Sequence, residues 1–315
     1  MSVVVIGDAN VDLEIVLPHH AKGGAHANSD PRRFGGGSAA NTAAMLAGLG
    51  VSSSFVGTVG DDDHGRFAIE SLAAAGVDTS LIEVATDLPT VMVMIVVPPD
   101  GERLIYVWPP SGGAHRALRT EVAVDSLIGA DWLHVSGLSL RVSPAREAIL
   151  AAMAHARDTS VAVSFDLNLR LENWGWDDDF REVVESAVSL SDVVLGAAVD
   201  EIAPLVDIED PVRAATALAG DHRLVIARLG ADGAVACSSA GAEAVDGFEV
   251  EVVDTTGAGD AFNAGFIAAR LANADVVEAV RWGNAVAALS VSQPGARGAV
   301  THVDAESLLT RAGDM

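Results

Sequence analysis

The chain is poor in several residue types, and each shortage restricts what it can be. Cys237 is the single cysteine among 315 residues, which excludes a disulfide framework and any metal site built from several cysteines. Lys22 is the single lysine, and no Gly-x-x-x-x-Gly-Lys-Ser/Thr motif occurs, so a Walker-type phosphate loop is excluded. The sequence also contains no run of about 18 uncharged apolar residues, so we expect no membrane-spanning helix.

Positive charge is scarce as well. The chain has 19 Lys and Arg residues against 44 Asp and Glu, for a net charge of −25. Such an acidic surface repels nucleic acid and anionic membranes, and we expect neither as a partner. A nucleotide triphosphate would have to be bound by local backbone amides, a metal ion and a few arginines. The chain runs directly into an apolar stretch at Val3 without a basic leader, so we expect a cytoplasmic protein.

Short apolar runs alternate with helical patterns through most of the sequence. The runs predict strands at 3–6, 54–59, 132–135, 161–165, 193–195, 224–227 and 234–237. The segments between them predict helices at 38–49, 65–75, 144–156, 178–190, 212–219 and 261–271. This alternation predicts a single α/β domain over residues 1–315, with a mostly parallel sheet and helices on both faces.

Two segments, 13–34 and 90–108, interrupt this alternation. Neither has helical periodicity, and the second is rich in β-formers around the turn sequence Pro98-Pro99-Asp100-Gly101. They flank a glycine-rich loop and could pair into a small separate sheet over a cleft. An ordinary edge hairpin explains the same pattern equally well.

The segment Asp254-Thr255-Thr256-Gly257-Ala258-Gly259-Asp260 precedes an apolar helical pattern. Gly257 and Gly259 permit a tight turn that directs backbone N–H groups at an anion, and the helix adds its positive end. A carboxylate at Asp260 is unfavourable beside such a site unless it has a chemical role. Accepting the proton of a hydroxyl that attacks a phosphate is such a role. A helix cap would explain the aspartate but not the paired glycines.

Three consecutive glycines, Gly35 to Gly37, precede the first predicted long helix and allow a ligand to approach the backbone closely. The pattern is not Gly-x-Gly-x-x-Gly and does not directly follow a strand, which disfavours a dinucleotide-binding site. Asn10 and Asp12 follow the first predicted strand, at the end where open α/β sheets bind ligands.

These motifs resemble the two signatures of the PfkB (ribokinase-like) carbohydrate kinases. The segment 254–260 is similar to D-T-x-G-A-G-D, and Gly36, Gly37 and Asn41 match G-G-x-x-x-N. The resemblance extends from residue 7 to 296, with the motifs in the family's order. It implies a ribokinase-like three-layer sandwich with a small β-lid built from 13–34 and 90–108. In several relatives this lid also forms a homodimer contact.

The resemblance implies ATP-dependent transfer of a γ-phosphate to a primary sugar hydroxyl, with Mg²⁺ bridging the phosphates. Asp260 would be the catalytic base, and the amides from Gly257 to Asp260, including those of Ala258 and Gly259, would form an anion hole. The residues implied in sugar binding are Asn10, Asp12, Gly36, Gly37 and Asn41.

Asp166, Asn168 and Arg170 occupy alternate positions just past a predicted strand. In an extended chain they would face the same side and point into the cleft. The pattern is similar to D-x-N-x-R of fructokinase-like and 2-keto-3-deoxygluconate kinase-like members, which favours 2-keto-3-deoxygluconate or fructose as substrate. Arg170 suits a substrate carboxylate or phosphate. An ion pair with Asp177–Asp179 explains it almost as well.

Two motifs depart from the family pattern. In the N-x-x-E element implied in magnesium binding, Glu201 is present but Ala198 replaces asparagine. In the T-x-G element near the nucleotide, Arg228 replaces threonine and Gly230 is kept. Arg228 could contact nucleotide phosphates or be a surface charge at a strand end.

The remaining implied residues concern the nucleotide and a monovalent cation. Thr256 and Asn284 match nucleotide-side positions, and Asp254 lies where some relatives hold a cation such as K⁺. A ribokinase or nucleoside kinase is an alternative reading. A non-catalytic, sugar-binding regulatory homologue is another, favoured only by Ala198 and disfavoured by the intact Asp260 segment.

Overall fold

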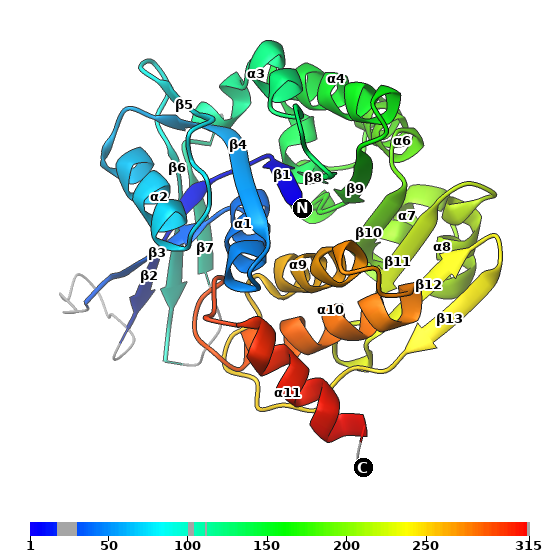
Figure 1. Ribbon diagram of the computed structural model, residues 1–315. Coiled ribbons are helices and arrows are strands. Elements are labelled where there is room, and N and C mark those ends of the chain that lie inside the picture. Colours follow the sequence, from blue (N-terminus) through cyan, green and yellow to red (C-terminus); the bar gives the residue numbers. More distant parts are fainter. Residues whose placement is uncertain (18–29, 100–103, 111, 314–315) are drawn as a thin grey trace.

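Residues 1–17, 30–99, 104–110 and 112–313 are described by a computed structural model. A sheet of nine strands forms its centre, in the order β13-β12-β11-β10-β9-β8-β1-β4-β5 (Figure 1). From β5 to β11 neighbouring strands run parallel, and β12 and β13 continue the sheet antiparallel. The strands are β1 Ser2–Ile6, β4 Ser52–Gly60, β5 Ile82–Ala85, β8 Trp132–Ser136, β9 Ala162–Asp166, β10 Val193–Ala197, β11 Leu224–Arg228, β12 Ala234–Ser238 and β13 Gly241–Val245.

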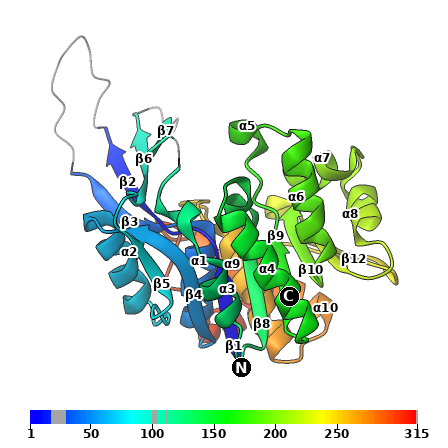
Figure 2. The same ribbon diagram turned by 90° about the horizontal axis from the view of Figure 1, so that it is seen from above.

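Helices cover both faces of this sheet, which confirms the three-layer α/β prediction (Figures 1 and 2). The side chains of β1 divide between two cores: Val3 and Val5 pack with one helical layer, Val4 and Ile6 with the other. The first layer contains α1 Ser38–Gly48, α2 Asp63–Ala74, α9 Ala258–Leu271, α10 Val276–Val291 and α11 His302–Gly313. The second contains α3 Thr120–Asp125, α4 Ala145–Asp158, α6 Asp178–Ser189, α7 Ala203–Val206 and α8 Pro211–Ala219.

Burial on both faces explains why the central strands read as continuous apolar runs. All of the predicted strands and helices are present, with ends that differ by one to a few residues. The strands β5 and β13 and the helices α3, α5 (Leu171–Trp174), α7, α10 and α11 were not predicted. Among the described residues, no helix is long and apolar enough to cross a membrane.

A second, four-stranded sheet has the order β3-β2-β6-β7 and lies at the β4–β5 side of the molecule (Figure 2). Its strands are β2 Asn10–Val16, β3 Arg32–Gly36, β6 Val91–Val97 and β7 Leu104–Trp108. The two irregular segments thus pair with each other, and the edge-hairpin alternative is wrong. Residues 18–29 and 100–103, including part of the expected turn, lie outside the described residues.

Candidate active site

The turn into α9 has the backbone form that the glycine pattern predicted. Gly257 has φ of 75°, a left-handed conformation, and a Cβ placed there would lie 2.7 Å from the carbonyl oxygen of Ala296. The helix then begins at Ala258, so Asp260 lies in its first turn and is buried. The first N–H groups of a helix have no intrahelical acceptor, so this turn offers donors to an anion.

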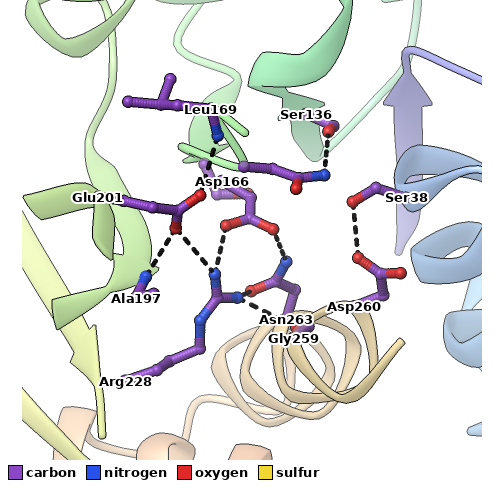
Figure 3. Close-up of polar contacts among 12 residues, drawn as sticks. Ser38, Ser136, Asp166, Leu169, Ala197, Glu201, Arg228, Gly259, Asp260 and Asn263 are labelled. Atoms are coloured by element: carbon purple, nitrogen blue, oxygen red, sulfur yellow. Dashed lines mark hydrogen bonds and ion pairs between the residues drawn. The ribbon is translucent and has the colours of Figure 1, made fainter. Parts of the chain in front are cut away.

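The Asp260 carboxylate is held by two residues of α1. Ser38 Oγ donates to Oδ1 at 2.6 Å, as Figure 3 shows, and Asn41 Nδ2 donates to Oδ2 at 2.9 Å. Burial raises the pKa of Asp260 to about 7, although these two hydrogen bonds lower it, and the charges of Asp166 and Asp8 raise it further. A carboxylate with a pKa near neutrality suits a general base.

The start of α1 depends on Asp8, a residue that the sequence analysis did not assign to the site. The helix begins after Gly37, which has no side chain to cap it, and Asp8 Oδ2 accepts from the N–H of Ser38 at 3.0 Å instead. Gly37 has φ of 98°, and a Cβ there would lie 2.5 Å from the carbonyl oxygen of Asp8. The third glycine is therefore required by both conformation and space, and it sets the position of Ser38.

The residues implied in sugar binding lie together beside this helix start. Asn10 Nδ2 donates to Asp12 Oδ1 at 2.6 Å, and a Cβ on Gly36 would lie 2.6 Å from both groups. Burial raises the pKa of Asp12 to about 6, and Asn10 and the charge of Arg297 oppose that rise.

Arg297 connects this cluster to Asp260, and sequence reasoning missed it. Its Nε donates to Asn41 Oδ1 at 2.9 Å and its Nη2 to the carbonyl oxygen of Gly36 at 2.9 Å. Its Nη1 donates to Ser71 Oγ at 3.0 Å on α2. Burial lowers the pKa of Arg297 to about 10, while the carboxylates of the site oppose that change. One guanidinium thus joins the glycine loop, α1 and α2.

The expectation of an extended chain after Asp166 is wrong. Asn168 and Arg170 have φ of 36° and 49°, both left-handed, so alternate side chains do not share a side. Asn168 is buried and donates to Ser136 Oγ at 3.3 Å, whereas Arg170 is exposed. The suggested partner Asp177 pairs with Arg141 at 2.8 Å.

Asp166 and Glu201 meet at Arg228 (Figure 3). Arg228 Nη2 lies 2.6 Å from Asp166 Oδ1 and 3.8 Å from Glu201 Oε2. Burial disfavours the charged guanidinium, but Asp166 and Glu201 outweigh it and raise the pKa of Arg228. Its side chain is only 15% exposed, so the surface-charge alternative for Arg228 is wrong.

Glu201 belongs to the π-helical turn Ala198–Ile202, after β10. Its carboxylate accepts from the N–H groups of Leu169 at 2.9 Å and Ala197 at 2.7 Å. Burial and the charge of Asp166 raise its pKa, and Arg228 and the two backbone donors oppose the rise. These contacts place Glu201 beside Asp166 at the carboxyl ends of β9 and β10.

A model of the pfkB family of carbohydrate kinases matches residues 1–302. The chain belongs to this family. As a member of this family of carbohydrate kinases, it is a phosphotransferase with an alcohol group as acceptor. It is 36% identical to the ATP-dependent ribose-1-phosphate kinase of Halopiger xanaduensis, over 95% of each chain. It is 32% identical to a fructokinase of Vibrio alginolyticus, over 93% of each chain.

Solved structures of two kinases share the fold over nearly the whole chain. The fructokinase of Xylella fastidiosa with bound ATP superposes with a TM-score of 0.87 at 26% identity, covering 99% of each chain. The aminoimidazole riboside kinase of Salmonella enterica, complexed with aminoimidazole riboside and an ATP analogue, superposes with a TM-score of 0.79 at 30% identity. That match covers 98% of this chain and 100% of the other.

Two of the residues that the resemblance implies in nucleotide binding, Gly230 and Asn284, lie after β11 and on α10. Gly230, with φ of 65°, turns the chain after β11. Asn284 on α10 donates through Nδ2 to the carbonyl oxygens of Val245 and Asp246, each at 3.1 Å, and so ties α10 to the end of β13.

Asp254 and Thr256 stabilise the loop that enters α9. Asp254 Oδ1 accepts from the N–H of Thr256 at 3.0 Å and from its hydroxyl at 2.7 Å, and Oδ2 accepts from the N–H of Gly295 at 3.0 Å. Across the described part of the chain, no cluster of three or more His, Cys, Asp or Glu side chains could hold a metal ion by itself.

Proposed function

We propose that this pfkB kinase transfers the γ-phosphate of ATP to a primary hydroxyl of a small sugar or sugar acid, with Asp260 as the catalytic base. One observation carries the proposal: Asp260, with a pKa of about 7, lies at the amino end of α9 and is hydrogen-bonded to Asn41 of the sugar-side cluster. A base and an anion-binding turn therefore share one helix end.

The sugar side is formed by Asn10, Asp12, Gly36, Gly37 and Asn41. Asp12 and Asn41 would bind sugar hydroxyls and orient the reacting one toward Asp260, which takes its proton. The amides of Gly257, Ala258, Gly259 and Asp260 would stabilise charge on the transferred phosphoryl group. Positioning and charge stabilisation provide most of the catalysis in phosphoryl transfer, so these parts suffice.

ATP would bind on the side of Gly230, Thr256 and Asn284, and Mg²⁺ would neutralise phosphate charge. Magnesium at such sites takes one or two carboxylates together with phosphates and waters. Glu201 would be such a carboxylate: it is buried, and its Oε2 lies 3.8 Å from Nη2 of Arg228, whose Nη1 contacts the anion-binding turn at Gly259. Asp254 is the carboxylate that we propose for a monovalent cation such as K⁺.

The substrate that we favour is 2-keto-3-deoxygluconate or fructose, because of the D-x-N-x-R pattern at Asp166, Asn168 and Arg170. In this proposal exposed Arg170 would bind a sugar-acid carboxylate, and buried Asp166 and Asn168 would also bind the substrate. Ribose, ribose-1-phosphate or a nucleoside is the second candidate, because two relatives, at 36% and 32% identity, carry the names ribose-1-phosphate kinase and aminoimidazole riboside kinase.

The small sheet would act as the lid over the sugar and as a homodimer contact. Asp12 and Gly36 belong to it, so closing the sheet over the cleft would bring sugar-binding groups with it. Its edge strand β7 exposes five consecutive apolar or aromatic residues, 104–108, which a second copy could cover. Sedimentation of the wild type and of Ile105→Lys would test this dimer: a wild type that sediments as a monomer excludes it.

The function is tested by coupled ADP release with ATP and Mg²⁺ on fructose, 2-keto-3-deoxygluconate, ribose, ribose-1-phosphate and adenosine. K⁺ is varied in parallel. We expect one substrate to dominate and Asp260→Asn to lower kcat by about 100- to 10,000-fold. An Asn variant with wild-type kcat contradicts the base role. Sugar binding by calorimetry without turnover on any substrate supports the regulatory homologue instead.

A further inference from the structure

Arg228 occupies an unusual position for a cation, because it lies against the first turn of α9. Its Nη1 donates to the carbonyl oxygen of Gly259 at 3.2 Å and to Asn263 Oδ1 at 2.9 Å (Figure 3). The amino end of a helix carries partial positive charge, so a guanidinium there is electrostatically unfavourable by itself. Arg228 stands at the position where the family pattern of the resemblance has threonine.

A closed set of hydrogen bonds fixes the guanidinium in that place. Asp166 Oδ1 accepts from Arg228 Nη2 at 2.6 Å, and Asp166 Oδ2 accepts from Asn263 Nδ2 at 2.8 Å. Asn263, which is fully buried, therefore accepts from the arginine and donates to the aspartate. The three planar groups orient one another, and Asp166 offsets the charge of the arginine.

The peptide that accepts from Arg228 is also part of the anion-binding turn. The carbonyl of Gly259 and the N–H of Asp260 belong to one conjugated peptide unit. A charged donor on that carbonyl draws electron density toward the oxygen and makes the N–H a stronger donor, as in cooperative hydrogen-bond chains. The guanidinium thus binds the carbonyl end of the peptide, whereas the N–H at the opposite end would point toward the phosphoryl group.

A side chain at residue 259 would crowd this contact. A Cβ on Gly259 would lie 3.1 Å from Arg228 Nη1 and 3.3 Å from Cζ, tighter than ordinary packing. The second glycine of the signature thus leaves space for the arginine beside the turn.

We propose that Arg228 is a positioning residue that strengthens the Asp260 amide as an anion donor from behind the turn, and does not itself bind the nucleotide phosphates. This inference rests on the proposed kinase function for its catalytic consequence. The electronic effect on the Asp260 peptide is a property of the unliganded protein and can be tested without substrate.

The test compares wild type with Arg228→Met and Arg228→Lys. The matched control is Arg223→Met. Arg223 directly precedes β11, at the end of the strand opposite to Arg228, and its Nη1 donates to the Leu218 carbonyl oxygen at 2.7 Å. The first readout is the amide ¹⁵N shift of Asp260 in unliganded protein labelled with ¹⁵N-aspartate, assigned by its loss in Asp260→Asn. We expect an upfield shift in Arg228→Met, a smaller one in Arg228→Lys, and none in the control.

The second readout separates a positioning role from direct phosphate binding. Loss of a whole oxyanion donor lowers kcat by about 100- to 1,000-fold, so weakening one donor should lower kcat by about tenfold. The KM for ATP should stay within about threefold of wild type, because the effect is largest in the transition state. Arg228→Lys should retain part of kcat, since a lysine keeps the charge but not the two-pronged geometry.

An unchanged Asp260 ¹⁵N shift in Arg228→Met overturns the proposal. A KM for ATP that rises about tenfold or more with kcat unchanged also overturns it, because that pattern indicates direct phosphate contact. Thermal melts show whether Arg228→Met folds. If it does not, the Asp260 ¹⁵N shift and the kinetic constants of Arg228→Lys test the proposal instead. If the wild type phosphorylates no sugar, the proposed function fails, while the ¹⁵N comparison still decides the effect on the peptide.

Discussion

Asn41 Nδ2 lies 2.9 Å from Asp260 Oδ2, although the two residues are 219 positions apart in the chain. The orientation of the Asn41 amide is determined on its other side, where Oδ1 accepts from Arg297 Nε at 2.9 Å. The amide therefore presents N–H to the carboxylate and not its oxygen. The base of the proposed reaction is thus aligned by a residue that the family pattern places in the sugar site.

The pH dependence of catalysis follows from the environment of Asp260. Because burial raises its pKa to about 7, the ionised base forms only as the pH rises through that value. We expect kcat/KM to rise with pH, with a midpoint near 7, measured with saturating ATP. Asp12, with a pKa of about 6, is the other group whose ionisation could cause this rise of kcat/KM with pH. Asp12→Asn should therefore keep the midpoint near 7, and a midpoint near 4 in the wild type would count against Asp260.

The same pKa predicts a conflict between stability and activity. The folded pKa of Asp260 lies above the value of about 4 for an unfolded aspartate. The carboxyl thus stabilises the fold fully below pH 4, and this stabilisation is lost as the pH rises through about 7. We expect Asp260→Asn, neutral throughout, to melt about 5 °C above wild type at pH 8, with a smaller difference at pH 5. The control is Asp125→Asn, an exposed substitution; an equal rise in both variants would refute the explanation.

Arg297 should matter for both stability and sugar binding. Arg297→Met removes donors to Asn41, Gly36 and Ser71, together with the positive charge that lowers the pKa of Asp12. We expect the free energy of unfolding to fall by about 1–3 kcal/mol in urea titrations, and the sugar KM to rise. Arg311→Met is the control, since Arg311 is exposed on α11 and its Nε donates to the Ser307 carbonyl oxygen within the same helix. A sugar KM that changes equally in both variants would contradict a role in the site.

Gly37 and Gly50 provide a matched pair for testing the glycine loop. Both have left-handed φ, 98° and 82°, but a Cβ at Gly37 meets Asp8 at 2.5 Å whereas one at Gly50 has nothing within 4 Å. Gly50→Ala should reduce stability by about 1–2 kcal/mol through backbone conformation alone, with activity kept. Gly37→Ala adds a steric clash that displaces Ser38 from Asp260, so we expect a larger loss of stability and a large fall in kcat. Equal effects in the two variants would show that space at Gly37 is unimportant.

Local patterns were sufficient for the layered fold. Strands buried on both faces read as continuous apolar runs, and helices between them carry their own periodicity, so β1, β4 and β8 to β12 could be recognised one by one. The glycine pairs at 36–37 and 257–259 were also readable, because left-handed turns before a helix restrict residue type locally. By contrast, the left-handed conformation of Arg170 had no such marker, and at Asn168 asparagine marks it only weakly.

The sequence by itself determined the succession of strands and helices along the chain, the two glycine turns and the carboxylate at Asp260. Each of these depends on neighbours within a few positions. Only the tertiary structure decided what surrounds that carboxylate. Ser38, Asp8, Arg297 and the inward-facing Arg228 reach the site across separations of 30 to 261 residues. Burial by those distant segments removes water from Asp260 and raises its pKa, and no local pattern records how the chain packs against itself.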